Sequence, residues 1–199
     1  MKVLLIGSGG REHALAWKLT RSSGLTELHA APGNPGIAEL GTCHPVRAED
    51  GEGLLDLARS LEAGLVVVGP EAPLVGGVAD ELRHMGVLVF GPGKDAARIE
   101  GSKTFAKEVM RAAGVATAES LSVARPPCVL KVDGLAGGKG VFVCPDQETL
   151  DDALREAARL DQPLLIEALL EGEELSLFAL ADGRNAVALA PARDYKRIG

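Results

Sequence analysis

A glycine-rich loop flanked by lysines is the segment of this sequence that most clearly indicates a chemistry. Residues 129–143 read VLKVDGLAGGKGVFV, with Lys131 before the loop and Lys139 inside it. A glycine has no Cβ, so its backbone N–H can approach a phosphate oxygen closely, and the lysines would supply positive charge. The loop glycines are Gly134, Gly137, Gly138 and Gly140. We therefore predict a polyphosphate site; a flexible hairpin loop with solvated lysines is the structural alternative.

This loop is not a P-loop. The pattern G-x-x-x-x-G-K-[ST] would require glycine at position 133 and serine or threonine at position 140. Asp133 and Gly140 stand at these positions, and the segment 141–143 that follows has the apolar character of a strand. We therefore expect a flap between two strands that covers phosphates, and not a helix N-terminus that seats them.

The elements that must position this loop change in type near residue 93. Before it, short apolar strands alternate with helical patterns, which predicts βαβ units and a Rossmann-like parallel sheet with ligand loops at the strands' carboxyl ends. The strands are expected at 3–6, 27–31, 65–68 and 87–90, with helices at 11–20, 54–61 and 78–85. The loops that follow the strands are glycine- or proline-rich: 7–12, 32–36, 69–74 and 91–94.

Beyond Gly93 the pattern predicts an α+β part in which helices pack on an antiparallel sheet. Ser102 is placed to cap the helix expected over 103–113. A further helix is expected over 147–160, with strands at 164–168, 175–181 and 186–190 besides the two around the glycine loop. The highly charged residues 192–199 show no cap, strand or tail character, so we expect a chain that is cut rather than finished.

Composition excludes several classes of protein. A net charge of −7 argues against a nucleic-acid surface, because phosphate backbones select basic faces. Cys43, Cys128 and Cys144 are isolated, which fits a reduced cytosolic protein and argues against structural zinc. No apolar run is long enough to span a membrane.

Residues 7–13, GSGGREH, stand where a dinucleotide-binding fingerprint would lie. Glu12 takes the place of the third glycine, and no acidic residue follows the second strand, so a dinucleotide is disfavoured. A phosphate at the N-terminus of the following helix, with Arg11 adding charge, is the functional interpretation. A tight turn alone is the structural one.

Three carboxylate or lysine positions have both a functional and a structural interpretation. Glu71 lies in a proline-flanked turn, where it could meet a ribose hydroxyl or an amine, or only solvent. Lys103 opposes the dipole of the helix that it starts, which a bound anion would explain. In 164–177 a strand followed by a carboxylate suits an adenosine, although an acidic run is also typical of a solvated turn.

Together these segments closely resemble the glycinamide ribonucleotide synthetases, which are ATP-grasp ligases of purine biosynthesis. The resemblance spans the whole chain and rests on GSGGREHALAWKL (7–19), APGNPG (31–36), VGPEAPLVGGVAD (68–80), FGP (90–92), EGSKTFAKEVM (100–110), LKVDGLAGGKGV (130–141), LIEALLEGEELS (165–176) and DYKRIG (194–199). It implies ATP-dependent ligation of glycine to 5-phosphoribosylamine through glycyl phosphate, with Mg²⁺ or Mn²⁺ as the metal. We expect a cytoplasmic monomer with small-molecule substrates and neither nucleic-acid nor membrane partners.

The resemblance also implies roles for residues of this chain. ATP binding falls to Lys103, Lys131, the flap residues Gly134, Gly137, Gly138, Lys139 and Gly140, the adenine-hinge residues Glu167 and Leu169, and the ribose carboxylate Glu174. Phosphoribosylamine binding falls to Gly9, Gly10, Arg11, Asn34 and Glu71. Lys196 and Arg197 are the catalytic candidates near the γ-phosphate.

The chain departs from the family pattern at three positions: Gly137 stands where alanine is usual, Ala168 where glutamate is usual, and Tyr195 where histidine is usual. The family's chains are also about twice as long, and the half that is missing here carries the metal ligands, so we expect no metal site in this chain. We expect the 199 residues to be inactive alone.

The resemblance implies four parts. They are a Rossmann-like substrate domain (1–101), the helical start of the ATP-grasp domain (102–122), its lid (123–192) and a truncated returning segment (193–199). The alternatives are another ATP-grasp purine ligase, formate-dependent or carboxylating, and a non-catalytic nucleotide-binding module. An NAD-linked oxidoreductase is disfavoured by Glu12.

Overall fold

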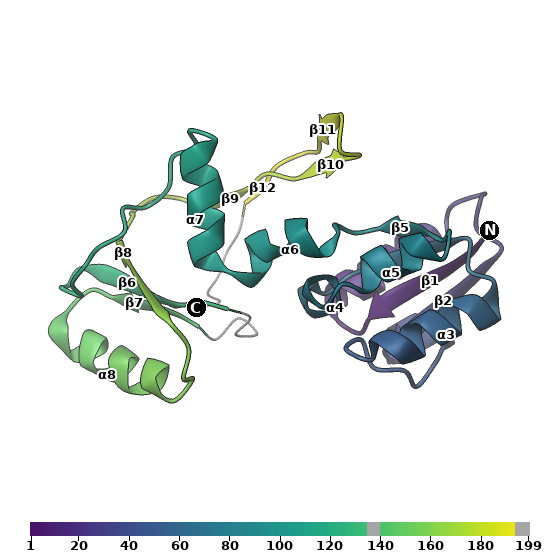
Figure 1. Cartoon of the computed structure of the whole chain (residues 1–199), viewed down its shortest axis with the longest axis horizontal. Helices are drawn as coiled ribbons and strands as arrows, with labels where there is room; N and C mark the ends of the chain where they lie inside the picture. Colours follow the sequence, from purple (N-terminus) through teal and green to yellow (C-terminus); the bar gives the residue numbers. More distant parts are fainter. Residues whose placement is uncertain (135–139, 194–199) are drawn as a thin grey trace.

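The computed structural model describes residues 1–134 and 140–193, which form two α/β parts joined by helix α6 (Figure 1). The first part holds a five-stranded sheet of order β3-β2-β1-β4-β5, in which every pair is parallel. Its strands are β1 (Lys2–Gly7), β2 (Glu27–Pro32), β3 (Thr42–Cys43), β4 (Leu65–Val68) and β5 (Leu88–Phe90). The predicted Rossmann-like parallel sheet is confirmed. Strand β3 was not predicted, because its two residues are too few to form a recognisable apolar pattern.

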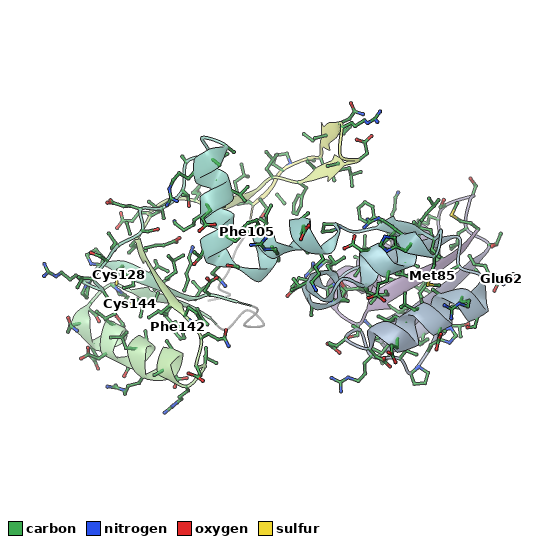
Figure 2. The ribbon with its side chains drawn as sticks, in the orientation of Figure 1. Glu62, Met85, Phe105, Cys128, Phe142 and Cys144 are labelled. Atoms are coloured by element: carbon green, nitrogen blue, oxygen red, sulfur yellow. The ribbon has the colours of Figure 1, made fainter. Side chains whose placement is uncertain are left out.

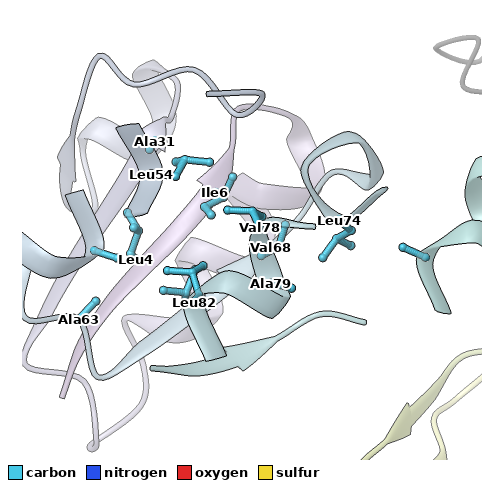
Figure 3. Close-up of a cluster of buried hydrophobic side chains, with 13 residues drawn as sticks. Leu4, Ile6, Ala31, Leu54, Ala63, Val68, Leu74, Val78, Ala79 and Leu82 are labelled. Atoms are coloured by element: carbon cyan, nitrogen blue, oxygen red, sulfur yellow. The ribbon is translucent and has the colours of Figure 1, made fainter. Parts of the chain in front are cut away.

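Both faces of this sheet are buried, which explains why its strands are continuously apolar. Leu4 and Ile6 of β1 point to one face, where α3 (Gly51–Leu61) and α5 (Val78–His84) cover them (Figure 3). Val3 and Leu5 alternate to the other face, where they pack with side chains of α1 (Gly10–Leu19) and α2 (Pro35–Ala38). The sheet is therefore a rigid base, and its loops are the parts free to bind ligands.

The segment 69–74 differs from the expected turn. Glu71 is the first residue of a short helix, α4 (Glu71–Gly76), with Pro70 as its N-cap. Pro73 is accommodated because the N–H groups of a helix's first turn have no partner within the helix, so a proline there loses no hydrogen bond. Helix α4 packs against α6 (Lys94–Gly101), and so links the sheet's loops to the second part.

The second part is a three-stranded antiparallel sheet between two helices, as expected. Strands β6 (Cys128–Val132), β7 (Val141–Cys144) and β8 (Leu164–Ala168) lie in the order β7-β6-β8, and the glycine loop connects β6 to β7. One face packs on α8 (Gln147–Ala158); Cys128 and Cys144 are register partners there and are labelled in Figure 2. Helix α7 (Lys103–Ala112) contributes to the opposite face.

The strand predicted over 175–181 is two strands in different sheets. Strand β9 (Leu175–Ser176) pairs with β12 (Ala192–Arg193), whereas β10 (Ala179–Ala181) pairs with β11 (Ala186–Ala188). The pairing partner changes at residues 177–178, which interrupts the ladder even though the apolar pattern continues. The predicted turn at Asp182 is confirmed, because Asp182 Oδ1 accepts hydrogen bonds from the backbone N–H groups of Arg184 and Asn185.

None of the helices within the described residues combines the length and the apolar character needed to cross a membrane.

A matched pair of leucines tests how the sheet's core is built. Leu4 is fully buried, whereas Leu88 on the edge strand β5 is 64% exposed. We expect Leu4→Ala to lower the free energy of unfolding by about 2–5 kcal/mol. The same change at Leu88 should cost less than about 1 kcal/mol, because it leaves no cavity. Urea unfolding followed by circular dichroism measures both, and equal losses would contradict this assignment of the core.

Candidate functional site

The first candidate cavity lies at the switch point of the parallel sheet. Strands β1 and β4 are neighbours whose crossovers lead to opposite faces, and a crevice forms at such a point beyond the carboxyl ends of the strands. Arg11 Nη1 donates to the backbone oxygen of Gly69 at 3.1 Å, which ties the loop after β1 to the loop after β4. A cavity of about 710 Å³ opens here. Its lining residues are Arg11, Gly69, Glu71, Leu74, Pro92, Ala97 and Glu100.

Only part of the predicted phosphoribosylamine site lines this cavity. Arg11 and Glu71 do so, and they lie in the first turns of two different helices, α1 and α4, and not in loops. Gly9, Gly10 and Asn34 are not among the lining residues. Asn34 instead holds the loops together: its Nδ2 donates to Ser8 O at 2.9 Å, and its Oδ1 accepts from Ile37 N as the N-cap of α2.

Glu12 places a carboxylate where the sequence suggested a phosphate. Its Oε2 accepts a hydrogen bond from Gly9 N at 2.6 Å, at the N-terminus of α1. The residue is only 5% exposed. Its Oε1 accepts no hydrogen bond from the described residues and lies 3.8 Å from Arg11 Nε. The anion at this helix N-terminus is therefore the protein's own, which gives the physical reason why the loop does not suit a dinucleotide.

The N-terminus of α7 is built in the same way. Ser102 caps the helix through Phe105 N, as predicted, and Asp133 Oδ1 accepts from Lys103 N at 2.6 Å. Burial would raise the pKa of Asp133, but hydrogen bonds from Thr104, Lys103 and Ser102 outweigh it and lower that pKa. The carboxylate of Asp133 is therefore an anion near Lys103 that belongs to the chain itself.

The ammonium group of Lys103 lies at the entrance of the glycine loop. Its Nζ donates to the backbone oxygens of Val132 and Gly134, at 2.8 and 3.1 Å. At the other end of the loop, the backbone oxygen of Gly140 accepts from Val132 N at 2.7 Å. Lys103 therefore lies where the strand becomes the loop, and its role in holding phosphate stays a prediction.

A buried carboxylate between two lysines forms the centre of the second candidate site. Glu167 of β8 is 4% exposed, and its Oε2 lies 2.6 Å from Lys131 Nζ of β6. Its Oε1 lies 2.7 Å from Lys107 Nζ of α7. Burial alone would raise the pKa of Glu167, but the hydrogen bonds and charges of the two lysines outweigh it and lower that pKa. The carboxylate is thus ionised and binds three elements together.

These side chains line a cavity of about 230 Å³ whose walls combine charged and apolar side chains. Its charged lining residues are Glu100, Lys103, Lys107, Lys131 and Glu167. Three lysines and two carboxylates give the lining one net positive charge, which favours an anion. The structure therefore brings together Lys103, Lys131 and Glu167, which the sequence placed in one site.

Lys107 is the residue that sequence reasoning missed. It is 6% exposed, although it belongs to the residue type least often buried. A signal was available in its spacing, because Lys107 is four residues after Lys103 and shares its helix face. Two like charges at this spacing repel each other unless carboxylates lie nearby.

Other predicted residues are only partly placed. Leu169 follows β8 directly, and Glu174 is exposed just before β9; neither lines the cavity of about 230 Å³. Gly137, Gly138, Lys139, Tyr195, Lys196 and Arg197 lie outside the described residues. Within 1–134 and 140–193, no group of three or more His, Cys, Asp or Glu side chains could hold a metal ion.

Comparison with known proteins gives matches along the whole chain. Residues 1–100 match the family model of the phosphoribosylglycinamide synthetase N domain, and residues 101–199 match that of its ATP-grasp (A) domain. A phosphoribosylamine–glycine ligase of Streptomyces coelicolor is 51% identical over 99% of this chain and 49% of the relative. The chain spans about half the length of the curated relatives it matches.

Solved structures agree in fold. The crystal structure of a phosphoribosylamine–glycine ligase from Thermotoga maritima has a TM-score of 0.77 and 33% identity, over 99% of this chain and 51% of that one. A carboxyaminoimidazole ribonucleotide synthase from Aspergillus clavatus has a TM-score of 0.75 at 21% identity, over 98% and 54% of the two chains. This second likeness concerns the fold alone.

The pH dependence of stability tests the buried carboxylate. A lowered pKa of Glu167 contributes stability above its usual value of 4.5, and this stability is lost as the pH falls and the carboxylate is protonated. Glu167→Gln should cost about 3 kcal/mol at pH 7, because it leaves two ammonium groups without their anion. Below a pH of about 4.5 the difference between the two proteins should narrow.

Urea unfolding between pH 3.5 and 7 measures this difference. The control is Glu108→Gln, which changes the exposed residue next to Lys107 on α7 and should shift stability by at most about 0.5 kcal/mol. A difference for Glu167→Gln that stays constant over the whole range would show that the carboxylate does not carry the charge assigned to it.

A pair of glycines tests the position of Glu12. A Cβ at Gly69 would overlap Glu12 Oε1, and moving that carboxylate would break its bond to Gly9. We expect Gly69→Ala to cost about 1–3 kcal/mol. Gly76→Ala is the control, because nothing lies within 4 Å of its Cβ, and it should change stability by less than about 1 kcal/mol. A tolerated Gly69→Ala would mean that the carboxylate is not fixed there.

Proposed function

Since this chain belongs to the phosphoribosylglycinamide synthetase family, we propose that it supplies the nucleotide and amine-substrate sites of a phosphoribosylamine–glycine ligase. The reaction joins glycine to 5-phosphoribosylamine and converts ATP to ADP and phosphate. The glycine carboxylate attacks the γ-phosphate to form glycyl phosphate; the amine then attacks the glycyl carbon, and phosphate leaves. The activity is a proposal, because this chain spans about half the length of the relative from Streptomyces coelicolor.

One observation carries this proposal: the two cavities share a wall. Glu100 on α6 lines both the switch-point cavity with Arg11 and Glu71 and the lysine-rich cavity with Lys103 and Lys131. A ligase that makes an acyl phosphate must deliver it to an amine before water reaches it, so the two sites must adjoin. Helix α6 lies between the two parts of the structure (Figure 1), and this position supports the proposal.

Each cavity suits a different substrate. Lys103 and Lys131 would hold the phosphates of ATP, and the backbone at Glu167 and Leu169 would read adenine, with Glu174 on the ribose. Arg11 and Glu71 would meet phosphoribosylamine, with Gly9, Gly10 and Asn34 shaping the loops around it. Neutralising charge on the transferred phosphoryl group is the main task of such a site.

Several expectations belong to this same proposal. We place the ligands for Mg²⁺ or Mn²⁺ outside the described residues, and Lys196 and Arg197 near the γ-phosphate. The division at 101, 122 and 192, the cytoplasmic monomer and the inactivity of the 199 residues alone also stay predictions.

A chimera tests the reaction. We would join this chain to the second half of the Streptomyces coelicolor relative and follow phosphate release with ATP, glycine and phosphoribosylamine. Release should require all three substrates, and neither formate nor bicarbonate should replace glycine. Release with formate or bicarbonate instead of glycine would support a different ATP-grasp ligase, and nucleotide binding without any release would support a non-catalytic module.

Lys131→Met in the same chimera should lower kcat by about a hundredfold or more, because one charge that stabilises the transferred phosphoryl group is lost. Lys18→Met is the control, since Lys18 is exposed on α1 and lines neither cavity. Equal activity of the two variants would contradict the role assigned to Lys131.

A further inference from the structure

Lys107 is too enclosed to act as a ligand itself. Its Nζ donates to Ala118 O at 2.5 Å, to Thr117 Oγ1 at 3.3 Å and to Glu167 Oε1 at 2.7 Å. These three contacts use all three donors of an ammonium group. Lys131 differs, because its side chain is 32% exposed and its Nζ is paired with Glu167 Oε2. A ligand in the cavity can therefore reach Lys131 but not the nitrogen of Lys107.

The carboxylate of Glu167 transmits the position of one lysine to the other. It is held from the α7 side by Lys107, and its backbone is held by β6 on one edge and by a bridge to Ser120 on the other. Since the backbone and one oxygen are fixed, the second oxygen points in one direction, toward Lys131. A rigid carboxylate fixes the position of a flexible lysine ammonium group more precisely than a solvent-exposed carboxylate would.

Lys107 also changes the charge that a ligand meets. Without it, Glu167 and Lys131 would form a neutral pair, and that pair would attract phosphate weakly. With it, two ammonium groups share one carboxylate, so the triad keeps a positive charge at Lys131 of β6. Because Lys131 is only 32% exposed, this charge acts on an anion more strongly than a fully solvated charge would.

We propose that Lys107 is a positioning residue: it holds Glu167, which orients Lys131, and it leaves the triad with the positive charge that attracts a polyphosphate. The inference deepens the proposed function and rests on it for the identity of the nucleotide. It assigns to α7 a role in phosphate affinity that its sequence position alone does not suggest.

Ligands that differ in phosphate number separate this role from a structural one. In the 199-residue chain, Lys107→Met should weaken ATP and inorganic tripolyphosphate about ten- to a hundredfold, and adenosine less than twofold. Calorimetry or thermal-shift titration measures the three affinities. Lys107→Arg keeps the charge and should retain most of the ATP affinity. Equal losses for adenosine and ATP, unchanged ATP affinity in Lys107→Met, or an arginine variant as weak as the methionine variant would each overturn the proposal.

A double-mutant cycle supplies a readout that needs no ligand. If Lys107 acts through Glu167, the losses in unfolding free energy for Lys107→Met and Glu167→Gln should be strongly non-additive. Additive losses would overturn the proposal. Strong coupling together with tripolyphosphate binding, but no ATP binding, would support the role of Lys107 and contradict the proposed function. The two failures are therefore distinguishable.

Discussion

The second half of this structure depends on one buried carboxylate. Glu167 is almost fully enclosed, and a buried charge is tolerated only when it is paired and hydrogen-bonded. Its partners, Lys107 and Lys131, come from positions 60 and 36 residues before it, so the requirement fixes α7, β6 and β8 relative to one another. The same requirement creates the site: satisfying one anion with two cations leaves positive charge at the edge of the cavity.

Two helix N-termini are governed by the same electrostatic rule. Glu12 provides the anion at α1, and Asp133 provides it at α7, so the dipoles that could attract a phosphate already have a carboxylate. In the proposed function, phosphate affinity would then depend on the side chains of Lys103 and Lys131. For a chain with a net charge of −7, such local concentration of positive charge is the way to hold an anionic substrate.

The parts that sequence reasoning predicted are those fixed by short-range pattern. The continuously apolar strands predicted the parallel sheet, because strands that are buried on both faces have apolar residues at every position. Ser102 correctly predicted the start of α7. The misses arise from contacts distant in sequence. The burial of Lys107 depends on Glu167, and the break between β9 and β10 depends on two different partner strands. The four-residue spacing from Lys103 is a local sign of Lys107, but it does not reveal burial against Glu167, and the change of partner strand leaves no sign within a few residues.

Glu71 and Glu100 show how the remaining arrangement follows from packing. A proline-bounded segment that resembled a turn forms α4, and α4 packs on α6, so the residue that starts one helix and the residue near the end of the other line one cavity. Because α4 packs on α6 and α6 continues through Ser102 into α7, the helix that carries Lys107 is connected to the segment after β4 that Arg11 of α1 contacts. Since Glu100 of α6 lines both cavities, a shift of α6 would change both at once, which makes the spacing of the two cavities a property of the fold and not of either site alone.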